Sequence, residues 1–225
     1  MKLVSVIIPV YNAQDTIQRA IDSALNQNFP KKDFEVIVVN DGSTDKTLDI
    51  LKKYNKKIKI INQQNQGAVR AANVGFKRAK GKYVIKLDAD DFFEQNILKE
   101  MVKILDQKPK IDFVYCDYYE KLKNGKIKRV STENIFNTLA GGIMFRKNKL
   151  AREGFYRKDI KFPEYDLLLK TQKKWQGFHI QKPLFYYNRS KKSLTGNKQW
   201  TKEAMGELKK LHLQKIEEIK KIRKY

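Results

Sequence analysis

Two stretches carry β-forming side chains up to a terminal carboxylate: Phe34-Glu35-Val36-Ile37-Val38-Val39-Asn40-Asp41, and Tyr83-Val84-Ile85-Lys86-Leu87-Asp88, which runs on into Ala89-Asp90-Asp91. Carboxylates at the carboxyl ends of buried parallel strands lie where open α/β sheets bind their ligands. Ionised carboxylates crowd together only beside a compensating cation. The sequence therefore predicts a divalent metal that holds a diphosphate at this edge of a sheet.

The segments around these stretches alternate between strand-like and helix-like patterns. Residues 4–10 form an almost continuous apolar run, typical of a strand that is covered on both faces. Another short strand is expected at 58–61, and apolar residues recur at helical spacing after each strand. This alternation over residues 1–106 predicts a doubly wound, mostly parallel α/β sheet.

N-cap residues indicate where the first two helices begin. Asp15 is expected to cap the first helix, with Gln18 at the capping-box position, and Ser43 or Thr44 is expected to cap the second. The Gly-x-Gly-x-x-Gly fingerprint of dinucleotide binding does not follow the first strand, so NAD is not expected as a ligand.

The pattern changes after Pro109. Asn124-Gly125 lies between the strand-like runs 113–122 and 126–130 and predicts a β-hairpin. The elements expected beyond it are a loop at Gly141-Gly142, a helix over 165–175, an extended segment over 179–187 and a last helix over 200–222.

The charge of the chain is strongly positive, with 48 Lys+Arg against 25 Asp+Glu and a net charge of +23. The first 50 residues hold five basic and seven acidic side chains, so the excess lies later in the chain. Such a field attracts nucleic acid, anionic lipid headgroups or phosphorylated substrates, or it only keeps the protein in solution. Nucleic acid is not expected, because basic residues interleaved with aromatic ones and zinc-ligand spacings are missing.

Cysteine and histidine are scarce. The single Cys116 excludes an intramolecular disulfide and is expected to be buried, and two histidines are too few for a histidine-based metal site. Pro9 and Asn12 interrupt the apolar start of the chain, and no stretch approaches the ~20 apolar residues that span a bilayer. We therefore expect a cytoplasmic protein, either soluble or attached to the inner face of the membrane.

The acidic residues admit two interpretations each. In Asp88-Ala89-Asp90-Asp91, one carboxylate could meet a sugar hydroxyl and another Mg²⁺ or Mn²⁺, or the segment is a solvated turn that caps the next helix. Asp41 could accept from a ribose hydroxyl or a base N–H, or cap the following helix. Their joint occurrence on strands of one sheet favours the functional interpretation.

Two further segments carry candidate residues. In the segment 65–75, Asn65, Gly67 and Arg70 are placed to approach a diphosphate or sugar at a helix start, or the small residues only pack the helix on the sheet. In the segment 162–169, Glu164 and Asp166 flank a tyrosine: one could be a general base, or both could simply favour a helix N-terminus.

Together these motifs resemble family-2 glycosyltransferases with the GT-A fold. The resemblance rests on the motifs Ile8-Pro9-Val10-Tyr11-Asn12, Val39-Asn40-Asp41-Gly42-Ser43-Thr44-Asp45, Asn65-x-Gly67, Ala72-Asn73-x-Gly75, Asp88-Ala89-Asp90-Asp91, Gly154-Phe155, Glu164-Tyr165-Asp166 and Pro183-Leu184-Phe185-Tyr186-Tyr187. It implies one domain over 1–195, with a nucleotide-binding half at 1–106 and an acceptor-binding half at 107–195. Residues 196–225 would then be a basic amphipathic C-terminal helix.

The resemblance also implies the activity and the roles of the residues. The activity would be inverting transfer of a sugar from a nucleotide diphosphate, commonly a UDP-sugar, to a glycan or lipid-linked acceptor. Pro9 and Tyr11 would border the base, Asp41 would accept from the base or its ribose, and Asp88 would meet the ribose or sugar. Asp90, with Asp88 beside it, would hold Mn²⁺ or Mg²⁺.

Three positions depart from the family pattern. Glu164 stands where the family's Glu-Asp pair places its base, and Ala72 stands where an arginine often precedes Asn-x-Gly. Asn188-Arg189-Ser190 occupies the place of a histidine that follows the Tyr-Tyr segment. These departures leave open a second function, a catalytically weak or inactive relative that only binds a nucleotide or glycan.

The C-terminal segment has two interpretations. Its lysines flank an apolar stripe, so it could lie on an anionic membrane that carries lipid-linked acceptors, or it could pack on its own domain with a solvated basic face. The sequence does not identify the sugar, the acceptor or the oligomeric state.

Overall fold

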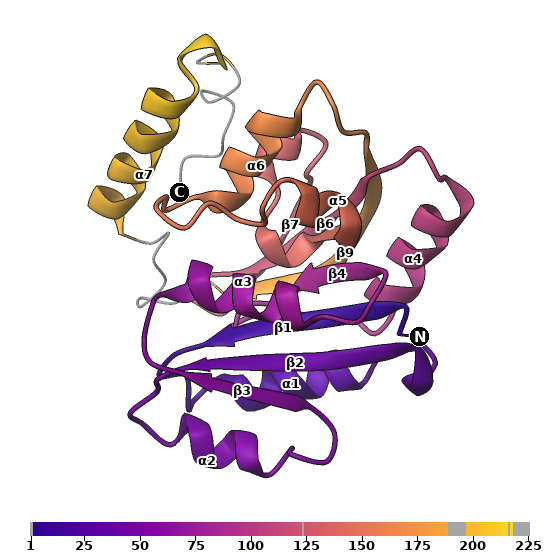
Figure 1. The fold of residues 1–225 in the computed structure, drawn as a ribbon, viewed down its shortest axis with the longest axis vertical. Helices are drawn as coiled ribbons and strands as arrows, with labels where there is room; N and C mark the ends of the chain where they lie inside the picture. Colours follow the sequence, from indigo (N-terminus) through magenta and orange to yellow (C-terminus); the bar gives the residue numbers. More distant parts are fainter. Residues whose placement is uncertain (1, 123, 189–196, 216, 218–225) are drawn as a thin grey trace.

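A computed structural model describes residues 2–122, 124–188, 197–215 and 217 of the chain (Figure 1). Over these residues the fold is built on one nine-stranded mixed sheet, flanked by helices on both faces. The strand order is β3-β2-β1-β4-β8-β6-β9-β5, and β7 pairs with β6 outside this order.

The first half of the sheet is parallel. It consists of β1 (Val4–Val10), β2 (Phe34–Asp41), β3 (Lys59–Gln63) and β4 (Tyr83–Lys86), in the order β3-β2-β1-β4. Every residue of β1 is buried, as expected for a strand between two others and under helices on both sides. The predicted doubly wound, parallel arrangement of residues 1–106 is confirmed.

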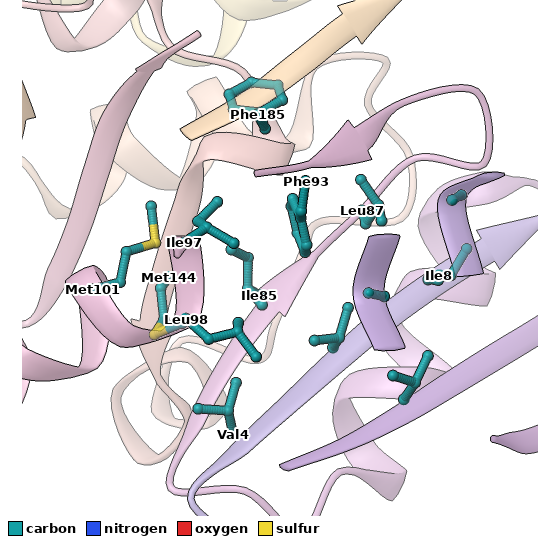
Figure 2. Packing of buried hydrophobic residues seen from close by; sticks show 14 of the residues in the cluster. Val4, Ile8, Ile85, Leu87, Phe93, Ile97, Leu98, Met101, Met144 and Phe185 are labelled. Atoms are coloured by element: carbon teal, nitrogen blue, oxygen red, sulfur yellow. The ribbon is translucent and has the colours of Figure 1, made fainter. Parts of the chain in front are cut away.

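Helices cover the two faces of this half. On one face, α1 (Ile17–Leu25) and α4 (Ile97–Gln107) bury their apolar sides in one core, and α2 (Thr47–Lys52) packs against α1. Figure 2 shows Ile97, Leu98 and Met101 of α4 in this core, which they share with Ile85. On the other face, α3 (Ala68–Arg78) packs on β1 and β2 within a second core.

The second half of the sheet is mixed. Its hairpin of β6 (Phe113–Lys121) and β7 (Ile127–Val130) turns at Gly125, whose φ of +78° confirms the predicted turn. The antiparallel strand β8 (Ile143–Arg146) joins β4 to β6, so a single sheet passes through both halves of the chain. The other elements are β5 (Phe92–Phe93), β9 (Gly177–Asn188), α5 (Lys147–Arg152), α6 (Pro163–Thr171), α7 (Lys198–Leu211) and the 3₁₀ turns Lys31–Asp33, Ile135–Asn137, Ala140–Gly142 and Leu213–Lys215.

The predicted helix caps are wrong. Helix α1 begins after Thr16 without a side-chain cap, because the carbonyl of Ala13 accepts from the Ile17 N–H at 2.9 Å. At α2, the Asp45 carboxylate accepts from the Thr47 N–H at 2.9 Å.

Ser43 and Thr44 are engaged elsewhere. The Ser43 hydroxyl accepts from the Asn12 N–H at 3.0 Å, and the Thr44 N–H donates to the Asn12 amide oxygen at 2.8 Å. Their polar groups therefore link the loop after β1 to the loop after β2, which explains why they do not cap α2.

The expected helix over 200–222 is interrupted within the described residues. Helix α7 ends at Leu211, because His212 leaves the helical conformation at φ −129° and ψ 52°. The His212 ring nitrogen Nε2 lies 2.8 Å from Asp166 Oδ1, which ties the end of α7 to α6. The expected apolar positions Ile216, Ile219 and Ile222 lie outside the described residues.

The apolar side of α7 packs on its own domain. Thr201, Ala204 and Leu208 are buried, and the Trp200 ring meets the Phe162 ring edge to face at 5.1 Å. For the described part of this segment, the packing favours the second of the two predicted interpretations. Across the described residues, no helix has the length and apolar character needed to cross a bilayer.

Close packing of α3 on β1 makes a stability prediction at Gly75. A Cβ there would lie 2.2 Å from Ile7 Cγ2, so we expect Gly75→Ala to lower the free energy of unfolding by about 1–3 kcal/mol. Gly206 in α7 is the matched control, because a Cβ there meets nothing within 4 Å, and Gly206→Ala should raise stability by up to about 1 kcal/mol through helix propensity. Urea titrations measure both. Equal stability of wild type and Gly75→Ala would contradict the close packing.

Candidate functional site

The predicted acidic residues lie at one edge of the parallel sheet. Strand β1 separates β2 from β4, with Pro9 opposite Val39 on one side and Ile7 opposite Lys86 on the other. Asp41 ends β2, and Asp88 follows β4 by two residues. Two strand spacings of ~4.8 Å separate the ends of β2 and β4 by about 10 Å, a span that one nucleotide diphosphate can bridge.

The segment after β4 is a tight acidic turn. The Asp91 N–H donates to the Asp88 carbonyl at 3.1 Å, and the Lys86 ammonium forms an ion pair with Asp88 at 2.7 Å. Asp91 is buried, and its carboxylate accepts from the Asn188 N–H of β9 at 2.9 Å. The turn is thus fixed from its own strand and from the far half of the sheet.

Burial and mutual repulsion raise the pKa values of two carboxyls in this turn. Burial, followed by the charge of Asp88, raises the pKa of Asp90 from 3.8 to about 6. Burial, then the charges of Asp90 and Asp88, raises the pKa of Asp91 well above its ordinary value. Ionisation of these two carboxyls is therefore costly, mainly because they are taken out of water, and a bound cation would offset that cost.

Glu164 lies in the same electrostatic cluster. Pro163 begins α6 and places Glu164 in the first turn of that helix. Burial raises the pKa of Glu164, against the opposing charge of Lys86 and with the charge of Asp88. Burial alone would lower the pKa of Lys86, but the carboxylates of Asp88 and Glu164 outweigh it, so the pKa of this ammonium is raised.

Asp41 organises the loop that precedes α3. Its Oδ1 accepts from the Gln63 side-chain amide at 2.7 Å and from the Gln66 N–H at 2.9 Å, and its Oδ2 accepts from the Gly67 N–H at 2.8 Å. The alternative role as a cap of α2 is wrong. Oδ2 keeps one lone pair for a ligand, so contact with a base or ribose stays a prediction.

Glycines let the loops after β2 and β3 approach each other. Gly42 has a φ of +75°, and a Cβ there would lie 2.8 Å from the Asn65 nitrogen. Gly67, with a φ of +91°, precedes the first residue of α3. A side chain at Gly42 would therefore push away the loop that Asp41 holds.

The other residues predicted to contact the nucleotide-sugar differ in their exposure to solvent. Tyr11 is 49% exposed and can present its ring to a base, whereas Pro9 is buried within β1. Asn65 and Arg70 are exposed around the start of α3. Contacts of these side chains with a nucleotide stay predictions.

The segment 72–75 performs a packing role. Ala72 is buried, and the Asn73 side chain donates to the Tyr156 carbonyl at 2.7 Å and accepts from the Tyr156 N–H at 3.0 Å. Ala72 thus lies in the core at the place where the family often has an arginine. For the small residues Ala72 and Gly75, the packing interpretation fits what the structure shows.

Asp166 faces the C-terminal segment. It is buried, with His212 Nε2 at 2.8 Å and Arg157 Nε at 3.4 Å from its two carboxylate oxygens. The direct catalytic role predicted for Asp166 stays untested, while the observed contacts tie α6 to the end of α7.

The sequence analysis missed two cations of the site. Lys86 is the one charged residue of β4 and pairs with Asp88, so a lysine inside an apolar strand was the available signal. Arg19 of α1 donates to the Asp90 carbonyl at 2.9 Å, a contact between residues 71 positions apart that no local pattern indicates.

The donor set of this turn suits a hard cation. Asp90 and Asp88 offer carboxylate oxygens, and Mg²⁺ or Mn²⁺ completes such a pair with phosphate oxygens and water. Burial and the charge of Asp88 raise the pKa of Asp90, and an ion held beside this carboxylate would favour its ionised form. Among the described residues, no set of three or more His, Cys, Asp or Glu is arranged to hold a metal on its own, so the fit depends on ligand oxygens.

Solved structures define the class of the fold. Residues aligned with 92% of this chain superpose on Staphylococcus aureus TarS 1–349 in complex with UDP-GlcNAc, with a TM-score of 0.73, 26% identity and 65% of that chain covered. A Pyrobaculum calidifontis mannosyltransferase, 17% identical, matches with a TM-score of 0.76 over 94% of this chain and 64% of that chain, which shows the fold alone. The fold is of the GT-A class.

The family follows from the sequence comparison. The model of glycosyl transferase family 2 matches residues 5–190, and the chain belongs to this family. An uncharacterized glycosyltransferase of Haemophilus influenzae is 32% identical over 173 residues, which cover 72% of this chain and 67% of the relative.

Other relatives are longer than this chain. An uncharacterized glycosyltransferase of Rickettsia prowazekii is 44% identical over 117 residues, covering 52% of this chain and 36% of the relative. The poly(ribitol-phosphate) β-N-acetylglucosaminyltransferase TarS is 37% identical over 107 residues, covering 46% of this chain and 19% of that protein. The aligned residues thus span about a third or less of these two relatives.

The buried acidic turn makes a prediction about stability and pH. A carboxyl with a folded pKa of about 6 and an ordinary value of 3.8 destabilises the fold increasingly between these two pH values and by a constant amount above them. We expect Asp90→Asn to raise the free energy of unfolding of the metal-free protein at pH 7, by on the order of 1–2 kcal/mol. This difference in the free energy of unfolding should vanish near pH 3, where residue 90 is uncharged in both the wild type and the variant. Denaturant titrations at several pH values measure it, and a loss of stability at pH 7 would contradict the crowding.

Proposed function

We propose that this chain is an inverting glycosyltransferase that moves a sugar from a UDP-sugar to a hydroxyl of a glycan or lipid-linked acceptor. The observation that carries the proposal is the electrostatic cluster of Glu164, Lys86 and Asp88. It sets the half-buried carboxylate of Glu164 in α6 beside the acidic turn at the strand ends. Sugar transfer from a nucleotide diphosphate needs a base for the acceptor hydroxyl and a cation for the leaving diphosphate. This cluster would supply the base and the carboxylates that hold the cation.

The donor would lie across the ends of β1, β2 and β4. The exposed Tyr11 ring can stack on a base, and the loop held by Asp41 gives main-chain groups for the ribose. The structure of TarS with UDP-GlcNAc supports UDP as the nucleotide, because that protein shares the fold at 26% identity.

The diphosphate would lie over the acidic turn, where Asp90 and Asp88 would hold Mn²⁺ or Mg²⁺. When bound, such an ion neutralises the charge that develops on the leaving diphosphate. Lys86 holds Asp88 in place through their ion pair. Arg70, exposed in the first turn of α3, is a further cation available to the phosphates.

Glu164 would act as the general base. The acceptor hydroxyl attacks the anomeric carbon from the face opposite the diphosphate, its proton passes to a Glu164 oxygen, and the bond to the diphosphate breaks. One attack from the opposite face inverts the anomeric configuration. Burial strengthens Glu164 as a base by raising its pKa, while the Lys86 charge favours its ionised form.

The acceptor would approach from the second half of the chain, where α6 presents Glu164. Relatives include poly(ribitol-phosphate) glycosyltransferases and a chondroitin synthase, which supports a polymeric glycan or teichoic-acid type of acceptor. The excess of positive charge in this half favours an acceptor that carries phosphate or carboxylate groups.

The base assignment predicts the effect of Glu164→Gln. The amide cannot take the acceptor proton, so transfer should fall by about 10²–10⁴-fold, while UDP affinity in Mn²⁺ stays unchanged. Release of UDP in the presence of an acceptor measures transfer, and calorimetry measures binding. Glu133→Gln, at an exposed residue of the second half, is the matched control and should keep wild-type rates.

Two results would change this assignment. Full turnover by Glu164→Gln would remove Glu164 from the base role. Wild-type protein that binds UDP with Mn²⁺, yet neither transfers sugar nor hydrolyses the donor, would instead identify a binding protein without turnover.

The metal assignment predicts the effect of Asp90→Ala. Without this carboxylate, the Mn²⁺-dependent part of UDP affinity should be lost, while weak metal-free binding remains, because the base and ribose contacts are made elsewhere. Calorimetric titration of UDP with Mn²⁺ and with EDTA separates the two parts. An unchanged affinity in Mn²⁺ would show that the ion is held by other residues.

A further inference from the structure

Helix α1 presents a polar stripe to the acidic turn. Arg19 and Ser23 lie one turn apart on the same side of α1, and Gln27 follows just after the helix ends at Leu25. These three residues form the stripe. The rest of that side packs in the core against the sheet, with Ala20 and Ala24 fully buried. The stripe is therefore held at a fixed distance from β4 and the turn after it.

Each member of the stripe binds the main chain of the segment after Asp88. An Arg19 guanidinium N–H donates to the Asp90 carbonyl at 2.9 Å, and the Ser23 hydroxyl accepts from the Phe93 N–H at 3.1 Å.

The Gln27 side-chain amide donates to the Glu94 carbonyl at 3.0 Å. The stripe thus fixes the path of the backbone from Asp90 to Glu94, where only a short strand offers ladder hydrogen bonds.

Arg19 makes a second contact, through the face of an aromatic ring. Its guanidinium carbon lies 4.4 Å from the centre of the Phe92 ring, and that ring stacks on Tyr186 at 4.4 Å with 11° between the planes. The guanidinium is thus held between the Asp90 carbonyl and an aromatic stack that reaches β9. Arg19 Nε is buried and has no hydrogen-bond partner within the described chain. The contacts with the Asp90 carbonyl and the Phe92 ring therefore set the position of the guanidinium.

We propose that Arg19 is a positioning residue of the donor site, which fixes the main chain of Asp90 so that its carboxylate points at the cation of the nucleotide diphosphate. This inference rests on the proposed function, since it assigns a supporting group to the Mn²⁺ and UDP site. Arg19 touches neither reactant. Its effect passes through the Asp90 peptide and through the ring of Phe92.

Lysine at this position separates geometry from charge. Arg19→Lys keeps the positive charge near Asp90 but lacks the planar fork that stacks on Phe92 while donating to a carbonyl. Arg19→Met keeps an apolar stem and loses both. If the position of the guanidinium matters, both variants weaken Mn²⁺-dependent UDP binding. If only the positive charge matters, Arg19→Lys binds as wild type does.

Calorimetric titration of UDP, in Mn²⁺ and in EDTA, tests the proposal. We expect Arg19→Lys and Arg19→Met to weaken Mn²⁺-dependent UDP binding about tenfold, the effect of losing one charge-assisted hydrogen bond, with metal-free binding changed less than about twofold. Gln18→Ala is the matched control, because Gln18 is an exposed neighbour on the same helix, and it should bind as wild type does.

Ser23→Ala keeps the test decisive if the Arg19 variants fold poorly. It removes one hydroxyl that accepts from the Phe93 N–H, and it should weaken Mn²⁺-dependent binding in the same direction. Wild-type affinity in folded Arg19→Lys would overturn the positioning role, and so would wild-type affinity in folded Arg19→Met or Ser23→Ala. Failure of the wild-type protein itself to bind UDP in Mn²⁺ would overturn the proposed function instead.

Discussion

The ion pair of Lys86 with Asp88 is the interaction on which the site depends. A charged residue at the end of a buried strand is costly to bury unless it is paired, and here the lysine is surrounded by carboxylates. Its charge acts on Asp88, Asp90 and Asp91 of the turn and on Glu164 of α6. One cation thus holds together acids from two halves of the sheet, and it leaves enough negative charge for a second cation.

The mixed sheet brings these acids together. Parallel pairing of β1 with β2 and β4 carries Asp41 and Asp88 to one edge, and antiparallel pairing of β4 with β8 attaches the half that contributes α6. The helices then secure the loops: α1 binds the turn after β4, and α3 seats its small residues on β1. The packed core of Figure 2, which joins Ile85 of β4 to Phe185 of β9, makes the two halves one rigid support for the site.

The sequence predicted the parallel half, the hairpin and the candidate acids, because strand runs, helical spacing and Asn-Gly turns are local signals. The helix caps were predicted wrongly. Ser43 and Thr44 bond to the distant loop at Asn12 instead of capping α2, and the nearby Ala13 carbonyl accepts from the first N–H of α1 without a side-chain cap from Asp15. The end of α7 was missed because His212 binds Asp166 across 46 positions of sequence. Arg19 and Lys86 act through contacts that arise only after folding, so residue patterns alone did not indicate them.

A crystal structure of the protein grown with UDP and Mn²⁺ tests the central claim most directly, through the anomalous signal of manganese. The account predicts one manganese peak within coordination distance of Asp90, between the acidic turn and the diphosphate, with the uracil against the Tyr11 ring and Glu164 facing the open side of the cluster. A nucleotide bound away from the strand ends, or manganese held by residues remote from Asp88 and Asp90, would contradict it.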